Sequence, residues 1–182
     1  MNDRKLFWSR AANWGALLGV VIVGLESLIP LLSLSANSAV FVMVLVEVAM
    51  ITVIWISGRQ NVYTHWQAKP YNYARSLGFV ALTLMFAGIV RGTGMFATNE
   101  WLVPGYYTEL ARQQIEVMLS ADDVPASIKT YLETSEGAAL RYMHNPLVCI
   151  TSGVISMLDL VLLFVPPIFL RKKQEKNTPY NE

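Results

Sequence analysis

Four long apolar runs constrain the fold of this 182-residue chain more than any other feature. They cover residues 14–34, 39–57, 76–97 and 146–170, and each holds a single ionisable residue. A bilayer core about 30 Å thick is crossed by about 20 residues of α-helix, which satisfies its own backbone hydrogen bonds. The runs therefore predict an all-α integral membrane protein with four transmembrane helices.

Composition narrows the function classes. Hydrophobic residues make up 54% of the chain and charged residues 15%, below the roughly one quarter of a soluble domain. The net charge of +1 gives no reason to expect nucleic-acid binding. The single cysteine, Cys149, excludes an internal disulfide and a zinc site made of cysteines. The sequence contains no HExxH, GxSxG, P-loop or GxGxxG motif. We expect no enzyme activity, no cofactor and no metal.

The first run could instead be a secretory signal peptide that is removed. It follows basic residues, and small residues near 35–39 resemble a cleavage site. The run is long for a signal peptide, however, and it contains Glu26. We therefore expect the first helix to be retained.

Lysine and arginine counts set the expected orientation. The residues before the first run, the connection between the second and third runs and the polar tail 171–182 are rich in these residues. The turn 35–38 has none, and residues 98–145 have three against seven acids. Both termini are therefore predicted to be cytoplasmic, in a bacterial cytoplasmic membrane.

The long connection before the fourth run predicts a helical hairpin over residues 104–143 on the outer face. Pro104 and Gly105 break the third helix, and apolar residues then recur at three- and four-residue steps from 106 to 119. Asp122, Asp123 and Pro125 are typical of the start of a second helix. The hairpin could be a lid, a substrate gate, or a docking surface formed by Tyr107, Leu110 and Met118.

The ionisable residues inside the four runs are Glu26, Glu47, Arg91 and Asp159. At 1.5 Å per residue the first three lie about 9–12 Å from the outer ends of their helices, and Asp159 lies about 18 Å in. Charges at such depths are costly and usually pair. Because arginine can bind two carboxylates at once, we expect Arg91 to join Glu26 and Glu47, with Asp159 below them.

Small residues share helix faces with these charges and predict close helix packing. Gly15 and Gly19 lie on the face of Glu26, and Gly88 lies on the face of Arg91. The complete predicted set of helix-packing residues is Gly15, Gly19, Gly88, Gly92, Ser152 and Ser156.

Three acids and one arginine would sum to −2 if all were ionised, so one carboxyl group should be protonated or bound to a cation. A static polar contact, a proton- or cation-linked transport site and intramembrane chemistry are each compatible with this arrangement.

The layout resembles the bacterial membrane-protein family catalogued as domain of unknown function 4199. The residues that carry the resemblance are Tyr71–Ala74 entering the third run, the segment Pro104–Met118 and the basic end Leu170–Lys173. The resemblance implies the four-span topology and no activity.

We therefore expect a non-enzymatic accessory or assembly subunit that lies in the lipid bilayer. It would bind a membrane or envelope protein, or a second copy of itself, through the small-residue faces and the hairpin. The alternative is a small carrier linked to protons or cations.

Overall fold

The computed structural model describes residues 3–65, 73–121, 124–130, 144–158, 167–168 and 170. Over these residues the fold is helical throughout, without a strand. The elements are α1 (Asp3–Leu31), α2 (Ala36–His65), α3 (Tyr73–Ala97), the π-helical turn η1 (Thr98–Leu102), α4 (Tyr106–Ser120) and α6 (Pro146–Met157).

In the described part of the chain, three helical segments are long and apolar enough to cross a membrane: Lys5–Leu31, Asn37–Val62 and Tyr73–Leu102. This confirms a helical fold over the described residues, with three helices able to span a membrane. The helices do not coincide with the predicted apolar runs: α1 begins at Asp3 and ends at Leu31, and α2 continues to His65. Hydropathy marks the length that can lie in lipid, whereas the helical hydrogen bonds continue into the flanking polar residues.

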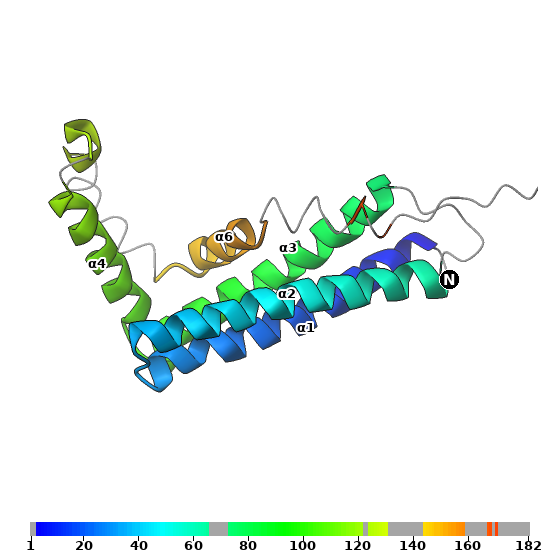
Figure 1. Cartoon of the computed structure of the whole chain (residues 1–182), viewed down its shortest axis with the longest axis horizontal. Coiled ribbons are helices and arrows are strands. Elements are labelled where there is room, and N and C mark those ends of the chain that lie inside the picture. The colour runs from blue at the N-terminus through cyan, green and yellow to red at the C-terminus, as the bar shows by residue number, and fades with distance from the viewer. Residues whose placement is uncertain are drawn as a thin grey trace, which may run out of the picture.

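α3 lies at the centre of the fold, between α1 and α6 (Figure 1). α1 runs parallel to α3, because Gly15 meets Thr83 and Gly19 meets Val90. α6 runs antiparallel to α3, because Gly88 meets Val154 and Gly92 meets Ile150.

These close contacts confirm the helix-packing role predicted for four glycines. A Cβ atom added at Gly15, Gly19, Gly88 or Gly92 would lie within 3.0 Å of an atom of the neighbouring helix. The glycine faces are therefore occupied inside the chain, and they are not free to bind a partner.

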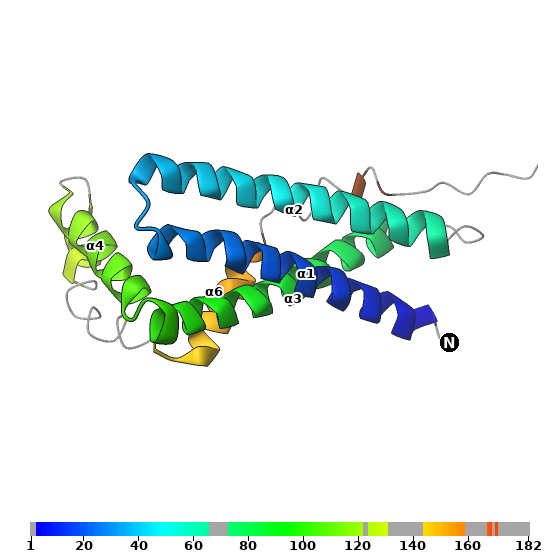
Figure 2. The same ribbon diagram turned by 90° about the horizontal axis from the view of Figure 1, so that it is seen from below.

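α2 lies beside α1 and packs mainly against it (Figure 2). Only a narrow stripe of α2 is buried. The stripe includes residues at three- and four-residue steps, namely Val42, Val46, Met50, Ile54, Ser57 and Asn61. In the most apolar 18-residue stretch of α2, only 22% is buried. The corresponding stretches of α1 and α3 are 44% and 39% buried. α2 therefore presents most of its circumference outwards.

The turn between α1 and α2 is closed by local hydrogen bonds. Ser33 is in the left-handed region with φ 47°, and the Leu34 amide donates to the Ile29 carbonyl at 3.0 Å. This is the Schellman geometry that ends helices. The hydroxyl of Ser35 then accepts from the amide of Ser38 at the start of α2.

The predicted fourth span and hairpin are described only in part. α6 covers 12 residues and is too short to cross a bilayer alone. α4 matches the helix expected over residues 106–119, and residues 126–130 form a short helical turn where a second helix was expected to begin. The described residues do not show a hairpin. The rest of the expected second helix and the tail 171–182 lie outside the described residues.

The glycine contacts predict opposite effects of one methyl group at two positions of α1. Gly19→Ala would place a Cβ atom 2.6 Å from that of Val90, and such overpacking typically costs about 1–3 kcal/mol. Gly24 has no neighbour within 4 Å, so Gly24→Ala should stabilise the helix by up to about 1 kcal/mol. Thermal unfolding in detergent measures both, and equal shifts of the two variants would contradict the packing.

Candidate functional site

An ion pair between Glu26 and Arg91 joins α1 to α3. The guanidinium Nη2 donates to Oε1 of Glu26 at 2.6 Å, and Nε donates to Oε2 at 3.0 Å. The Glu26 side chain is 6% exposed and the Arg91 side chain 20% exposed. Charge-assisted, two-point bonds of this kind are strong and fix the orientation of both partners.

Arg91 also links α3 to α6. Its Nη1 donates to the hydroxyl of Ser156, which in turn donates to the carbonyl of Gly153 at 2.9 Å. Arg91 therefore uses three of its five N–H groups on partners in the described part of the chain. One side chain thus binds both helices that flank α3.

The predicted contact between Arg91 and Glu47 is wrong. Glu47 is exposed, and its neighbours in the buried stripe of α2 are Val46 and Met50. Both hydrogen bonds between Arg91 and a carboxylate in the described chain go to Glu26. The prediction matched Glu47 and Arg91 by their depth along their helices. Glu47, however, points away from the face of α2 that packs on α1.

Ser152 was predicted to pack against a neighbouring helix, and Asp159 was predicted to lie below the charge cluster. Ser152 is exposed and does not pack, because α6 faces α3 through Cys149, Gly153 and Met157. Asp159, the fourth predicted charge, lies outside the described residues.

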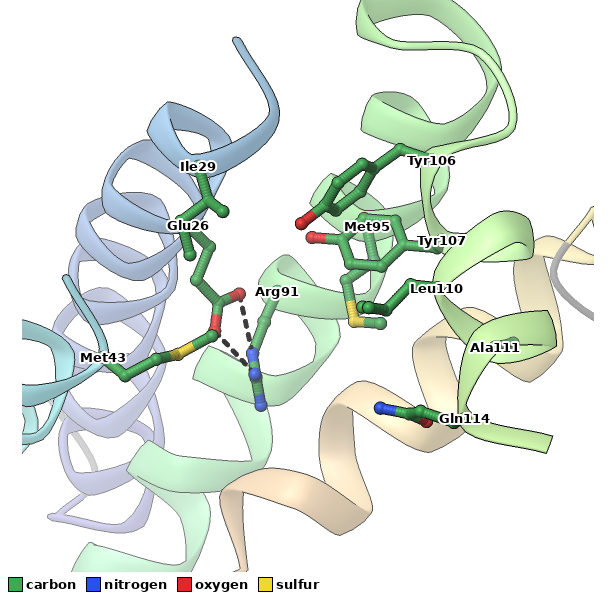
Figure 3. A pocket seen from close by; sticks show the side chains of 10 residues that line it. All are labelled: Glu26, Ile29, Met43, Arg91, Met95, Tyr106, Tyr107, Leu110, Ala111 and Gln114. Atoms are coloured by element: carbon green, nitrogen blue, oxygen red, sulfur yellow. Dashed lines mark hydrogen bonds and ion pairs between the residues drawn. The ribbon is translucent and has the colours of Figure 1, made fainter. Parts of the chain in front are cut away.

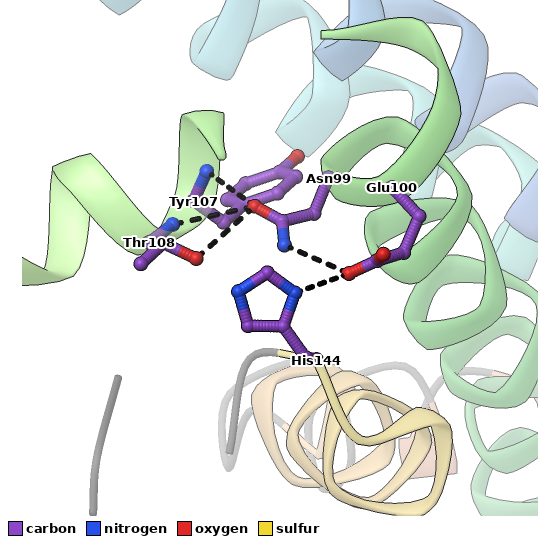
Figure 4. A network of polar contacts seen from close by, with 5 residues as sticks. All are labelled: Asn99, Glu100, Tyr107, Thr108 and His144. Atoms are coloured by element: carbon purple, nitrogen blue, oxygen red, sulfur yellow. Dashed lines mark hydrogen bonds and ion pairs between the residues drawn. The ribbon is translucent and has the colours of Figure 1, made fainter. Parts of the chain in front are cut away.

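η1 positions the start of α4 through Asn99, which is 1% exposed. The Oδ1 atom of Asn99 accepts from the amides of Tyr107 at 3.0 Å and Thr108 at 3.3 Å (Figure 4). Gly105, the residue before α4, has φ 77° and no side chain to cap the helix. Asn99 therefore supplies from the preceding element the acceptor that the first turn of α4 needs.

The same network reaches α6. The Nδ2 atom of Asn99 donates to Oε1 of Glu100 at 3.5 Å, and that oxygen also contacts Nδ1 of His144 (Figure 4). Asn145 then caps α6 by accepting from the Leu147 amide at 3.0 Å. The beginnings of α4 and α6 are thus both tied to η1.

A cavity of about 270 Å³ lies between α4 and the ends of α1, α2 and α3 (Figure 3). The Glu26–Arg91 pair lines one side of it, and the hydroxyl groups of Tyr106 and Tyr107 point into it from α4 (Figure 3). The remaining lining residues are Ile29, Met43, Met95, Leu110, Ala111 and Gln114.

The phenol of Tyr107 stays neutral in this setting. Burial raises its pKa well above the usual value, and the nearby charge of Glu26 adds to the shift. Tyr107 is therefore a neutral hydrogen-bonding group at physiological pH. The cavity combines one full ion pair, neutral hydroxyls and apolar walls.

The structure divides the predicted partner surface of Tyr107, Leu110 and Met118. Tyr107 and Leu110 line the cavity. Met118 lies further along α4 and is 48% exposed, and its neighbour Val117 is 67% exposed. Sequence periodicity found the amphipathic helix but could not show that its first turns face a cavity.

No protein-family model, curated protein or solved structure matches the chain. The resemblance to domain of unknown function 4199 therefore stays a prediction from the sequence.

The Asn99 cap predicts a local effect of one substitution. Asn99→Ala removes the acceptor for two part-buried backbone amides and should cost about 0.5–2 kcal/mol, the usual range for a lost helix cap. The amides of Tyr107 and Thr108 should exchange hydrogen faster than in the parent chain. Thr108→Val is the control, because it removes only the 3.5 Å hydroxyl contact. Unchanged exchange in Asn99→Ala would contradict the capping role.

Proposed function

We propose that this chain is a non-enzymatic accessory or assembly subunit that binds a transmembrane partner through the exposed face of α2. The observation that carries the proposal is Glu47, an ionisable residue on the outward side of an apolar helix. Facing lipid, such a residue costs about 2.5–3.5 kcal/mol on insertion scales. A partner helix with a hydrogen-bond donor or a cation would remove that cost.

The surface around Glu47 supports this reading. Its exposed neighbours on α2 are large and apolar: Val40, Phe41, Met43, Val44, Leu45, Val48 and Ile51. α2 packs mainly against α1, with a smaller contact to α3, and the residues of this face are exposed in the described chain. The glycine faces, by contrast, are already filled.

The proposed setting is a bacterial cytoplasmic membrane with both termini in the cytoplasm. The lysine and arginine distribution supports this orientation, which places α4 on the outer side. A fourth span over 146–170 is supported from both ends. α6 starts beside η1, and Leu170 packs against Gly58 towards the opposite end of α2.

A small proton- or cation-linked carrier is the second candidate, and the cavity beside the Glu26–Arg91 pair favours it. Against it, Leu18, Ile22, Leu84 and Ala87 are fully buried between α1 and α3. The contacts between the glycine faces also leave little freedom for these helices to separate. The geometry therefore favours the static subunit.

Photo-crosslinking in native membranes tests the partner surface. Photoreactive residues at the exposed positions 44 and 51 of α2 should give one discrete protein adduct, whereas one at the buried Val46 should not. An adduct of twice the chain mass would identify a second copy as the partner. Adducts with lipid alone at both exposed positions would contradict the proposal.

Glu47→Leu separates partner binding from folding. In the purified chain it should leave the melting temperature unchanged or raise it, because an apolar side chain suits an exposed face in lipid. In native membranes it should reduce the protein adduct at position 44 at least about fivefold, a loss of roughly 1 kcal/mol. A large drop in the melting temperature would instead show that Glu47 is structural.

A further inference from the structure

The cavity beside the Glu26–Arg91 pair has the chemistry of a binding site. Glu26 is 5% exposed and is held in place by two bonds from Arg91. The two tyrosine hydroxyls and the amide of Gln114 reach into the cavity from α4 (Figure 3). Polar groups from two sides therefore converge on one small volume.

Charge balance selects the class of ligand. Glu26 and Arg91 are the charged residues among those that line the cavity, and they sum to zero. A ligand with a net charge would leave a partly desolvated site charged, which is unfavourable. A zwitterion can set its cation beside Glu26 and its anion beside Arg91, and the total remains zero.

The neutral groups match the two ends of such a ligand. An ammonium group near Glu26 would meet the hydroxyls of Tyr106 and Tyr107. The centroids of the two rings are 5.1 Å apart, and the angle between the ring planes is 74°. Tyrosine oxygens accept hydrogen bonds from ammonium, and ring faces attract cations. On the other side, guanidinium N–H groups and the Gln114 amide suit phosphate oxygens.

The apolar part of the cavity leads to the surface of α2. Met43 lines the cavity and is 47% exposed, and it belongs to the apolar face around Glu47. Leu28 and Leu31 are also exposed at the same end of α1. A lipid could thus place its headgroup in the cavity and its acyl chains along these side chains.

We propose that this cavity binds a zwitterionic phosphoethanolamine group. The group could come from a membrane phospholipid or from a soluble glycerophosphodiester. This inference does not rest on the partner-binding role of α2.

The test measures lipid binding to the purified chain by native mass spectrometry. Phosphatidylethanolamine, phosphatidylglycerol and soluble glycerophosphoethanolamine serve as probes. We expect phosphatidylethanolamine to bind about tenfold more tightly than phosphatidylglycerol, a difference of about 1.4 kcal/mol. Binding of the soluble diester would show that the headgroup suffices, and binding of the phospholipid alone would assign the site to membrane lipid. Equal binding of both lipids, or a preference for phosphatidylglycerol, would overturn the proposal.

Glu26→Gln supplies the sharpest arm, because it leaves Arg91 unpaired and changes the cavity charge from zero to +1. The lipid preference should then reverse in favour of the anionic phosphatidylglycerol. Glu47→Gln is the matched control, since it makes the same chemical change outside the cavity and should keep the parent preference. A folded Glu26→Gln protein with the parent preference would contradict the assignment.

Tyr107→Phe covers the case in which Glu26→Gln does not fold. It removes one cavity hydroxyl and leaves the ion pair and the Asn99 cap in place, because the cap uses the Tyr107 backbone. Affinity for phosphatidylethanolamine should fall about three- to tenfold. Unchanged affinity in this variant would contradict the proposed ammonium site.

Discussion

The two-point bond between Glu26 and Arg91 fixes the arrangement on which the rest of the structure depends. It ties α1 to α3, and through Ser156 it also reaches α6. The glycine contacts on either side of α3 bring the three backbones close enough for these bonds to form. Helices in lipid associate without a hydrophobic driving force, and close packing and hydrogen bonds hold them together. The ion pair and the glycine contacts therefore both hold α1, α3 and α6 together.

The pair also explains why the two remaining polar features point to binding. Arg91 forms its carboxylate hydrogen bonds with Glu26, and Glu47 is exposed on α2. The proposed partner would supply the group that compensates the charge of Glu47. At the end of the bundle the pair forms one wall of a cavity that Asn99 and η1 close by holding α4 in place. One interaction thus lies between the exposed apolar face of α2 and a small polar cavity.

The sequence predicted three helices long enough to span a membrane, the amphipathic α4, the glycine contacts and the Glu26–Arg91 contact. Length, periodicity and depth along a helix are local properties, which the sequence alone can give. It failed for Glu47, since depth gives the height of a residue but not the side of the bundle that its helix presents. It also missed the η1 turn and the Asn99 cap, because a π-helical turn has no simple periodic signal and the cap comes from eight residues before Tyr107. Pro104 and Gly105 signalled a break, but not which side chain would satisfy the new helix.

The most direct test of this account is a pair of double-mutant cycles on thermal stability in detergent. In the first, Arg91→Ala is combined with Glu26→Gln, and we expect a coupling free energy of about 0.5–3 kcal/mol, because the second change removes the carboxylate that the first leaves unpaired. In the second, Arg91→Ala is combined with Glu47→Gln, and the effects should add to within about 0.5 kcal/mol. Additive effects for Arg91 and Glu26, or strong coupling between Arg91 and Glu47, would contradict the arrangement of charges described above.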